Sequence, residues 1–236
     1  MIPLFLLLGL GAGVLTTIAG QGGGLLLLLA CSALIGPHEA LAVTAPALLL
    51  GNLHRSLLLR THIDRPTAKR VIAGALPGAL LGGLLAGMTP AWVLRCLLVV
   101  LTAVAIAKAL GYVRFRVPQN ALAPTGFVIG GLTGTAGGAG ILFAPVLLST
   151  GLTGRAFVAT TSAVAVAAHI GRVAGYAGLG LFSKSLIAPT VAVTVAIFAG
   201  NAMGGRIHEL LTPRRSMAIE YGALVVCVVL SVAGLG

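Results

Sequence analysis

Acidic residues are scarce in this chain. Of its 236 residues only four are Asp or Glu, against 15 Lys and Arg, and the formal net charge is +11. The four acids are Glu39, Asp64, Glu209 and Glu220. Three of them lie in loops or at loop edges, whereas a proton relay or a cation site inside a membrane normally uses acids in mid-helix. Glu220, His54 and His169 are the remaining candidates for a relay.

Cysteine and the short motifs of enzymes are as sparse as acid. Cys31, Cys96 and Cys227 stand alone within apolar runs. Their spacing fits neither a disulfide framework nor a metal site, so we interpret the three side chains as small buried apolar groups. No GxSxG, HExxH, CxxC or Walker pattern occurs in the sequence. We therefore expect no enzyme, no metal or other cofactor and no ATP-driven pump.

Apolar residues, in contrast, dominate the composition. The chain is 58% hydrophobic and 8% charged, and its mean hydropathy of +1.10 is far above that of soluble proteins. These values predict an integral membrane protein. Several apolar runs are long enough for the roughly 20 residues of a spanning helix. The runs occupy residues 2–35, 40–54, 71–88, 91–111, 121–150, 156–176, 185–205 and 217–235.

An internal repeat divides the chain into two halves. The stretch GVLTTIAGQGGG at 13–24 recurs as GGLTGTAGGAGI at 130–141, an offset of 117 that also pairs Thr44 with Thr161 and Arg55 with Arg172. Chance alignment of apolar sequence has no reason to match glycine clusters and an arginine. We therefore predict two duplicated membrane units, 1–116 and 117–236. Duplicated halves with glycine-broken segments are typical of secondary transporters.

The first segment of each half is expected to be a broken helical hairpin. Residues 2–35 would span about 51 Å as one helix, too long for one crossing and too short for two. The run GQGGG at 20–24 supplies a break, because glycine disfavours helix and tolerates the positive φ of a tight reversal. The second copy, residues 121–150, breaks at Gly137, Gly138 and Gly140. In the third helix of the first half, the spacing of Gly74, Gly78 and Gly82 predicts close helix contact.

Loop charges predict how the halves are oriented. Lys and Arg gather in the loops 55–70, 108–116 and 206–215, which should face the cytoplasm, while the loops 88–90 and 177–183 carry none. This distribution also argues against a nucleic-acid partner. We predict an all-α integral membrane protein of two inverted repeats, each a glycine-tipped hairpin plus three transmembrane helices. Both termini should lie outside, and the N-terminus, which lacks the basic region of a signal peptide, should be retained.

The unwound glycine tips are the first candidate binding residues. Free backbone N–H groups and two half-helix N-termini aimed at one point favour an anion. The alternative is that the glycines only permit the bend. The candidates in the two tips are Gly20, Gln21, Gly22, Gly23 and Gly24, together with Gly137, Gly138, Ala139 and Gly140.

Polar residues at equivalent places on two later helices are the second group of candidates. They are Thr44, Asn52 and Arg55 in the first half and Thr161, His169 and Arg172 in the second. An arginine within a bilayer is costly unless it is partnered, so it usually faces a cavity or the interface. The alternatives are that both arginines are interfacial anchors and that the hydroxyls only bond to the preceding helical turn.

The assembled motifs resemble those of a known family. The glycine tips IAGQGGG and TAGGAG, and the helices ALAVTAPALLLGNLHR and AFVATTSAVAVAAHIGR, each with a basic end, resemble the sulfite exporter TauE/SafE family over residues 5–232. The first tip lacks the proline that usually follows the glycines in this family, whereas the second copy keeps Pro145. The resemblance implies a multi-pass carrier in the bacterial inner membrane. Its substrates would be sulfite, sulfonates, sulfoacetate or other small organic anions.

The sequence therefore predicts a secondary transporter for a small anion, most simply sulfite or an organosulfur anion, working by alternating access. Three alternatives stay open: an anion channel, a carrier of a small carboxylate, and a membrane-embedded enzyme using Ser162 and His169. The expected partners are the anion and the lipid bilayer. Coupling to a proton or another ion, the direction of transport and the oligomeric state are left open by the sequence.

Overall fold

All regular structure in the described part of the chain is helical. The computed structural model describes residues 1–18, 22–109, 112, 117–210 and five positions between 219 and 229. The α-helices are α1 (Ile2–Ile18), α2 (Gly23–Ile35), α3 (Pro37–Leu58), α4 (Arg65–Ala86), α5 (Ala91–Ala109), α6 (Leu122–Ala136), α7 (Phe143–Ser149), α8 (Gly154–Gly178) and α9 (Ile187–Leu210). Short 3₁₀ helices are η1 (Arg60–His62), η2 (Gln119–Ala121), η3 (Gly138–Leu142) and η4 (Lys184–Leu186). The predicted all-α class is confirmed.

Among the residues that the structure describes, three helices are long and apolar enough to cross a membrane: Arg65–Ala86, Gly154–Gly178 and Lys184–Ile207. Shorter apolar helices accompany them, among them α1 with 17 residues and α2 with 13. At 1.5 Å per residue these two arms reach roughly 26 and 20 Å, less than one bilayer core of about 30 Å. The chain is thus a multi-pass membrane protein whose first segment is broken, as predicted.

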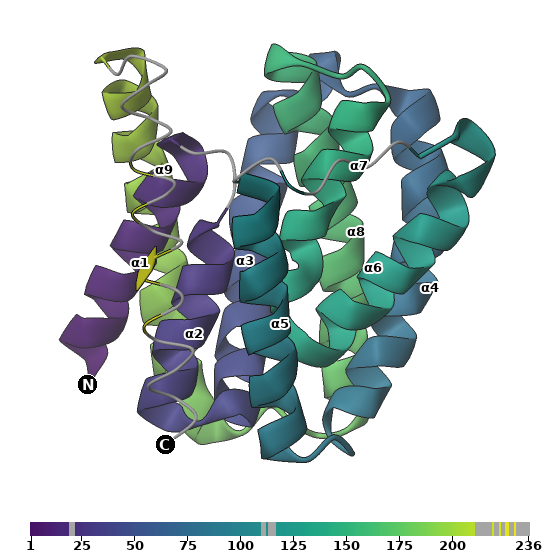
Figure 1. Cartoon of the computed structure of the whole chain (residues 1–236). Helices are drawn as coiled ribbons and strands as arrows, with labels where there is room; N and C mark the ends of the chain where they lie inside the picture. Colours follow the sequence, from purple (N-terminus) through teal and green to yellow (C-terminus); the bar gives the residue numbers. More distant parts are fainter. Residues whose placement is uncertain are drawn as a thin grey trace.

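Both breaks fall at the predicted glycines. The backbone has φ of 91° at Gly22 and 78° at Gly137, a conformation that glycine adopts without the steric cost of a Cβ. In Figure 1, α1 leaves the end of the molecule that holds the N-terminus and α2 returns toward it.

The second arm differs from its expected form. It begins with η3 and continues into the seven-residue α7, so no α-helix starts directly at this tip. Two causes lie in the sequence: Gly138 and Gly140 are weak helix formers, and Pro145 lacks the N–H that would bond to the carbonyl of Ile141 in a continuous helix.

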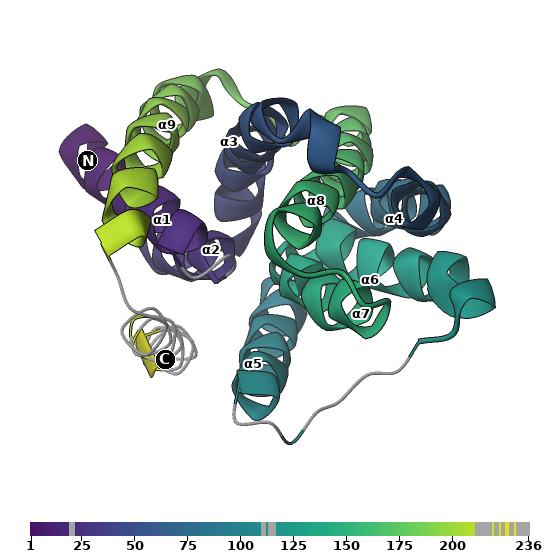
Figure 2. The same ribbon diagram turned by 90° about the horizontal axis from the view of Figure 1, so that it is seen from above.

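The helices pack in matching pairs from the two halves. α1 lies along α9, α6 lies along α4, and α3 and α8 contact each other. Seen from above, α3 and α8 stand between the α1–α9 pair and the α4–α6 pair (Figure 2). Each hairpin therefore packs its first arm mainly against a helix of the other half.

The α4–α6 contact is close enough to involve backbone. A Cβ added at Gly74, Gly78 or Gly82 would overlap the carbonyl oxygens of Ala123, Phe127 and Gly131 respectively. The predicted close approach of the glycine row is confirmed. This contact packs α4 tightly against α6, the first arm of the second hairpin.

The two ends of the molecule differ in their loops. The connection between α3 and α4 includes Arg60 and leads to Arg65, the first residue of α4, and it lies at the same end as the last turn of α9 (Figure 1). We call this the basic end. The N-terminus and the connections between α4 and α5 and between α8 and α9 lie at the opposite end, here called the N-terminal end.

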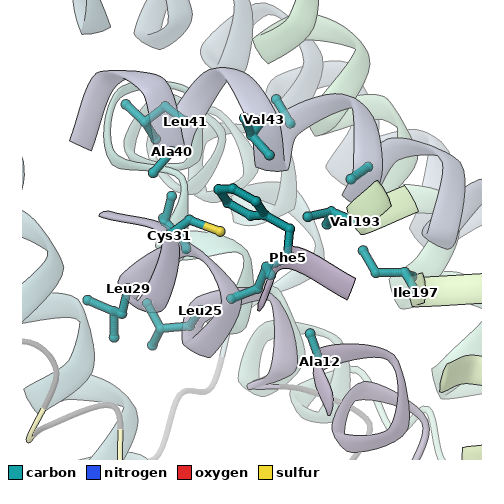
Figure 3. Packing of buried hydrophobic residues seen from close by; sticks show 14 of the residues in the cluster. Phe5, Ala12, Leu25, Leu29, Cys31, Ala40, Leu41, Val43, Val193 and Ile197 are labelled. Carbon is teal, nitrogen blue, oxygen red and sulfur yellow. The ribbon is translucent and has the colours of Figure 1, made fainter. Parts of the chain in front are cut away.

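A large apolar core packs the side of the molecule built by α1, α2, α3 and α9. The Phe5 ring lies among Cys31, Val43 and Val193 (Figure 3), and all four side chains are buried. Tyr176 and Leu41 belong to the same cluster. This packing joins the start of α1 to the start of α3, near the N-terminal end.

Asp64 fixes the start of α4 at the basic end. Its Oδ1 accepts a hydrogen bond from the Thr67 backbone N–H at 2.9 Å. The side-chain and backbone hydrogen bonds with Thr67 lower the pKa of the Asp64 carboxyl. Because the folded pKa is depressed, this cap stabilises the helix above the usual carboxyl pKa and its contribution is lost as pH falls through the folded value.

Candidate functional site

The two glycine tips meet at one cavity. A space of about 90 Å³ is lined by Gly22 and Gly24 from the first tip and by Gly137, Gly138 and Gly140 from the second. Residues more than a hundred positions apart in the sequence are thus brought together. A space of this size holds several water molecules or one solute of a few non-hydrogen atoms.

Polar side chains from α3 and α8 enter the same cavity. Asn52 and Arg55 come from α3, and Thr161, Ser162 and His169 from α8. Thr161 Oγ1 and His169 Nδ1 are buried, and neither forms a hydrogen bond to any described group. Buried polar atoms normally have partners. These two therefore point to a polar ligand in the cavity.

Arg55 connects the cavity to a larger space. Its guanidinium forms no hydrogen bond to any of the described residues, and it lines both the central cavity and a second one of about 390 Å³. Leu58 and Leu59 at the end of α3, with Ala202 and Gly205 near the end of α9, also line the larger cavity. We call this cavity the vestibule. It joins the site to the basic end.

Arg172, the repeat counterpart of Arg55, has a different environment. It is fully buried behind the second tip. Its Nε donates to the Tyr176 hydroxyl at 2.9 Å, and its Nη2 donates to the Leu41 carbonyl and to Thr44 Oγ1, each at 3.1 Å. The Tyr176 hydroxyl in turn donates to the Gly134 carbonyl at 2.6 Å. These bonds link α8 to α3 and α6.

The charge of Arg172 has no described counter-ion. Its bonding partners in the described chain are neutral oxygens, and its Nη1 is buried without a partner. A buried cation costs several kcal/mol unless an anion or a full set of hydrogen bonds compensates it. Nη2 lies next to the second tip, since a Cβ on Gly137 would approach it to 2.8 Å. Positive charge is therefore placed directly behind the tip.

The predicted site residues fall into three groups. In the cavity lie Gly22, Gly24, Asn52, Arg55, Gly137, Gly138, Gly140, Thr161 and His169. Outside the cavity lining but buried are Gly23, Thr44, Ala139 and Arg172. Gly20 and Gln21 lie outside the described residues.

The residues outside the lining have structural contacts that explain their places. Gly23 packs on α1, where a Cβ would overlap the Ala12 carbonyl oxygen. Ala139 is buried with Leu101 and Ala136. Thr44 donates to the Ala40 carbonyl at 2.8 Å, as the alternative for hydroxyls expected, while it accepts from Arg172.

Sequence reasoning missed Tyr176 and understated Ser162. Tyr176 lies four residues after Arg172, a spacing that places the two on one helix face. That spacing was the available signal, and the hydrogen bond at 2.9 Å is its consequence.

The expectation of two helix N-termini at the site is also only half right, because α2 starts at the first tip but η3 starts at the second.

The charged groups at the site are positive. Arg55 enters it, Arg172 lies behind it, and no carboxylate among the described residues lines it. The described part of the chain also contains no cluster of His, Cys, Asp and Glu that could hold a metal ion. The first N–H groups of α2 add a positive partial charge at Gly22.

Comparison with known protein families gives a match over nearly the whole chain. The family model described as Sulfite exporter TauE/SafE matches residues 5–233, which include both tips and every helix of the site. Searches of curated proteins and of solved structures return no match.

Proposed function

The chain belongs to the sulfite exporter TauE/SafE family of membrane transporters, and we propose that its cargo is a small anion moved by alternating access. The observation that carries this proposal is the cavity between the two tips, which Arg55 enters and which no described carboxylate lines. The family consists of transporters rather than enzymes, so the unpartnered polar atoms are interpreted as ligands of a cargo and not as catalytic groups.

The cavity offers an anion a compact set of donors. Arg55 brings a full positive charge, Thr161 brings a hydroxyl, and the start of α2 brings free backbone N–H groups. Charge-assisted hydrogen bonds of this kind are about twice as strong as neutral ones, and they can replace part of the anion's hydration. A cation would meet only repulsion from Arg55 and Arg172.

Sulfite or an organosulfur anion such as a sulfonate or sulfoacetate is the proposed substrate. The family name supports the sulfur chemistry, and the 90 Å³ of the cavity suits a small solute. Helix ends and arginines accept carboxylate or phosphate as well, so a small carboxylate is the competing substrate. The proposed location is the bacterial inner membrane.

Matching helix pairs support the two inverted repeats, 1–116 and 117–236. Under the offset of 117, α1 corresponds to α6, while α4 corresponds to α9 under an offset of 123. The repeat operation therefore converts the observed pair α1–α9 into the observed pair α6–α4. It exchanges α3 and α8 with each other, so their contact is converted into itself. In Figure 1, α1 and α6 run in opposite directions along the molecule.

We expect the two ends of the molecule to face opposite sides of the membrane, with Asp64 inside and Leu181 outside. Since Asp64 caps α4, the exposed Thr61 and Ser183 are better reporters. In a background without Cys31, Cys96 and Cys227, the Thr61→Cys variant should react with an impermeant maleimide only from the cytoplasm. The Ser183→Cys variant should react only from outside. Reaction of both from one side would contradict the inverted arrangement.

Anion titration of the purified protein tests the function itself. Sulfite, thiosulfate, sulfoacetate, phosphate, acetate and sodium are compared by thermal shift, where a ligand at a hundredfold excess over its Kd adds about 2.7 kcal/mol of stability. We expect sulfite or sulfoacetate to stabilise the protein most. Arg55→Gln should remove most of that effect, while Arg155→Gln, at an exposed position at the start of α8, should keep it. Stabilisation by sodium and by no anion would refute the proposal.

The closed N-terminal end favours a carrier over an anion channel. The vestibule connects the site to the basic end, whereas Leu41, Arg172 and Tyr176 are fully buried on the other side of the tips. Saturable uptake with counterflow in proteoliposomes would distinguish the two, since a channel gives no counterflow.

A further inference from the structure

The vestibule has a counterpart set of residues that is completely packed. Applying the offsets of 117 and 123 to its ten lining residues gives ten positions in the other half, and all ten are buried. They include Leu41, Thr133, Arg172 and Tyr176, whose exposed fractions are 0 to 1%. Residues at equivalent repeat positions thus line an open cavity at the basic end in one half and are tightly packed toward the N-terminal end in the other half.

The two arginines differ in the same way. Arg172 donates to Leu41 and Thr44, whose counterparts in the other half are Val158 and Thr161. Arg55 forms no bond to these counterparts or to any other described residue, although Val158 and Thr161 line the central cavity with it. The Thr161 hydroxyl, equivalent to the one that accepts from Arg172, is left unpartnered.

We propose that the packed set is a second anion-binding mouth in its closed form, and that the two arginines exchange roles during transport. In the state described here Arg55 and Thr161 bind the anion that enters from the basic end, while Arg172 is hydrogen-bonded to Leu41 and Thr44. In the opposite state Arg55 is hydrogen-bonded to Val158 and Thr161. Arg172 and Thr44 then bind the anion that enters from the N-terminal end. This inference rests on the proposed function and deepens it by assigning Arg172 as a ligand in only one state.

Tyr176 makes the exchange unequal. Its hydroxyl accepts from Arg172 and donates to Gly134, so it joins α8 to α6 across the closed region. The equivalent residue in the first half is Leu59, which has no hydroxyl. Tyr176 is therefore a positioning residue that favours the state in which Arg172 is docked, and the N-terminal mouth should open less readily than the vestibule.

Two cysteine reporters at repeat-equivalent positions test the exchange. In the background without native cysteines, Val158→Cys reports the vestibule and Leu41→Cys reports the second mouth. Without any further substitution, the cysteine at position 158 should react with an impermeant maleimide from the basic side, and the cysteine at position 41 should stay protected. Tyr176→Phe removes both hydrogen bonds of the hydroxyl. It should raise labelling at position 41 from the N-terminal side about tenfold and lower it at position 158, while Tyr112→Phe, at an exposed tyrosine, should change neither.

A converse variant keeps the test decisive if the buried reporter disturbs folding. Leu59→Tyr installs the missing hydroxyl four residues after Arg55 and should lower labelling at position 158, whereas Leu59→Phe should not. No change with Tyr176→Phe, equal gains at both reporters, or equal effects of Leu59→Phe and Leu59→Tyr would overturn the exchange. Anion stabilisation without reporter exchange sinks this inference alone. Reporter exchange without anion stabilisation sinks the proposed function.

Discussion

Replacing Gly22 with valine should abolish transport while the protein still reaches the membrane. Gly22 has φ of 91°, a region that a β-branched residue enters only with strain of about 1–3 kcal/mol. A Cβ at this position meets no atom within 4 Å, so the side chain would project into open space at the cavity rather than collide with a neighbour. Loss of function would thus come from a distorted tip and an occupied site.

Gly11→Val is the matched control for this variant. Gly11 lies in α1, its φ is not positive, and a Cβ there also meets nothing within 4 Å. Uptake into proteoliposomes and the amount of folded protein in the membrane should both stay near normal. Gly138→Val should behave like Gly22→Val, because its Cβ would come within 2.6 Å of Leu25 Cδ1 and push the tips apart. Normal uptake by well-expressed Gly22→Val protein would reduce the tips to structural spacers.

Arg172→Ala should lower the initial transport rate about a hundredfold, and Arg172→Lys about tenfold. The guanidinium donates to three different oxygens, and each charge-assisted bond contributes about 1.5–3 kcal/mol. Lysine keeps the charge but cannot reproduce the planar fork that reaches α3 and the Tyr176 hydroxyl together.

The same substitutions at Arg155 provide the comparison, since this arginine is on α8 as well but exposed. Initial rates in proteoliposomes, normalised to folded protein, should be unaffected by Arg155→Ala. Equal rates for Arg172→Ala and the unmodified protein would mean that the buried charge has no part in the transport cycle, and that it serves folding alone.

Much of this architecture could be read from the repeat. The duplicated glycine clusters predicted both breaks, and each cluster contains a glycine with positive φ, Gly22 in the first tip and Gly137 in the second. The glycine row of α4 predicted a close helix contact, and the structure shows that its partner is α6. These predictions succeed because they depend on local backbone preferences that the sequence states directly.

The division of work between the two arginines could not be predicted. Arg55 and Arg172 occupy the same repeat position, so sequence register assigns them the same place. Their environments differ because the described state packs one end of the molecule and opens the other, a property of conformation and not of register. The 3₁₀ start of the second arm was also missed, since its cause is the joint effect of Gly138, Gly140 and Pro145.

The pairing of α1 with α9 has a consequence for biosynthesis. α1 ends at Ile18 and α9 begins at Ile187, and ribosomes add about 5–20 residues per second. The glycine face of α1, where Gly9 and Gly13 approach the α9 backbone, must wait on the order of ten to thirty seconds for its partner to be made. During that interval α1 can pack only against its contacts in the first half, which are α2 and the start of α3. The packing of the first helix is thus completed only when α9 has been made and inserted.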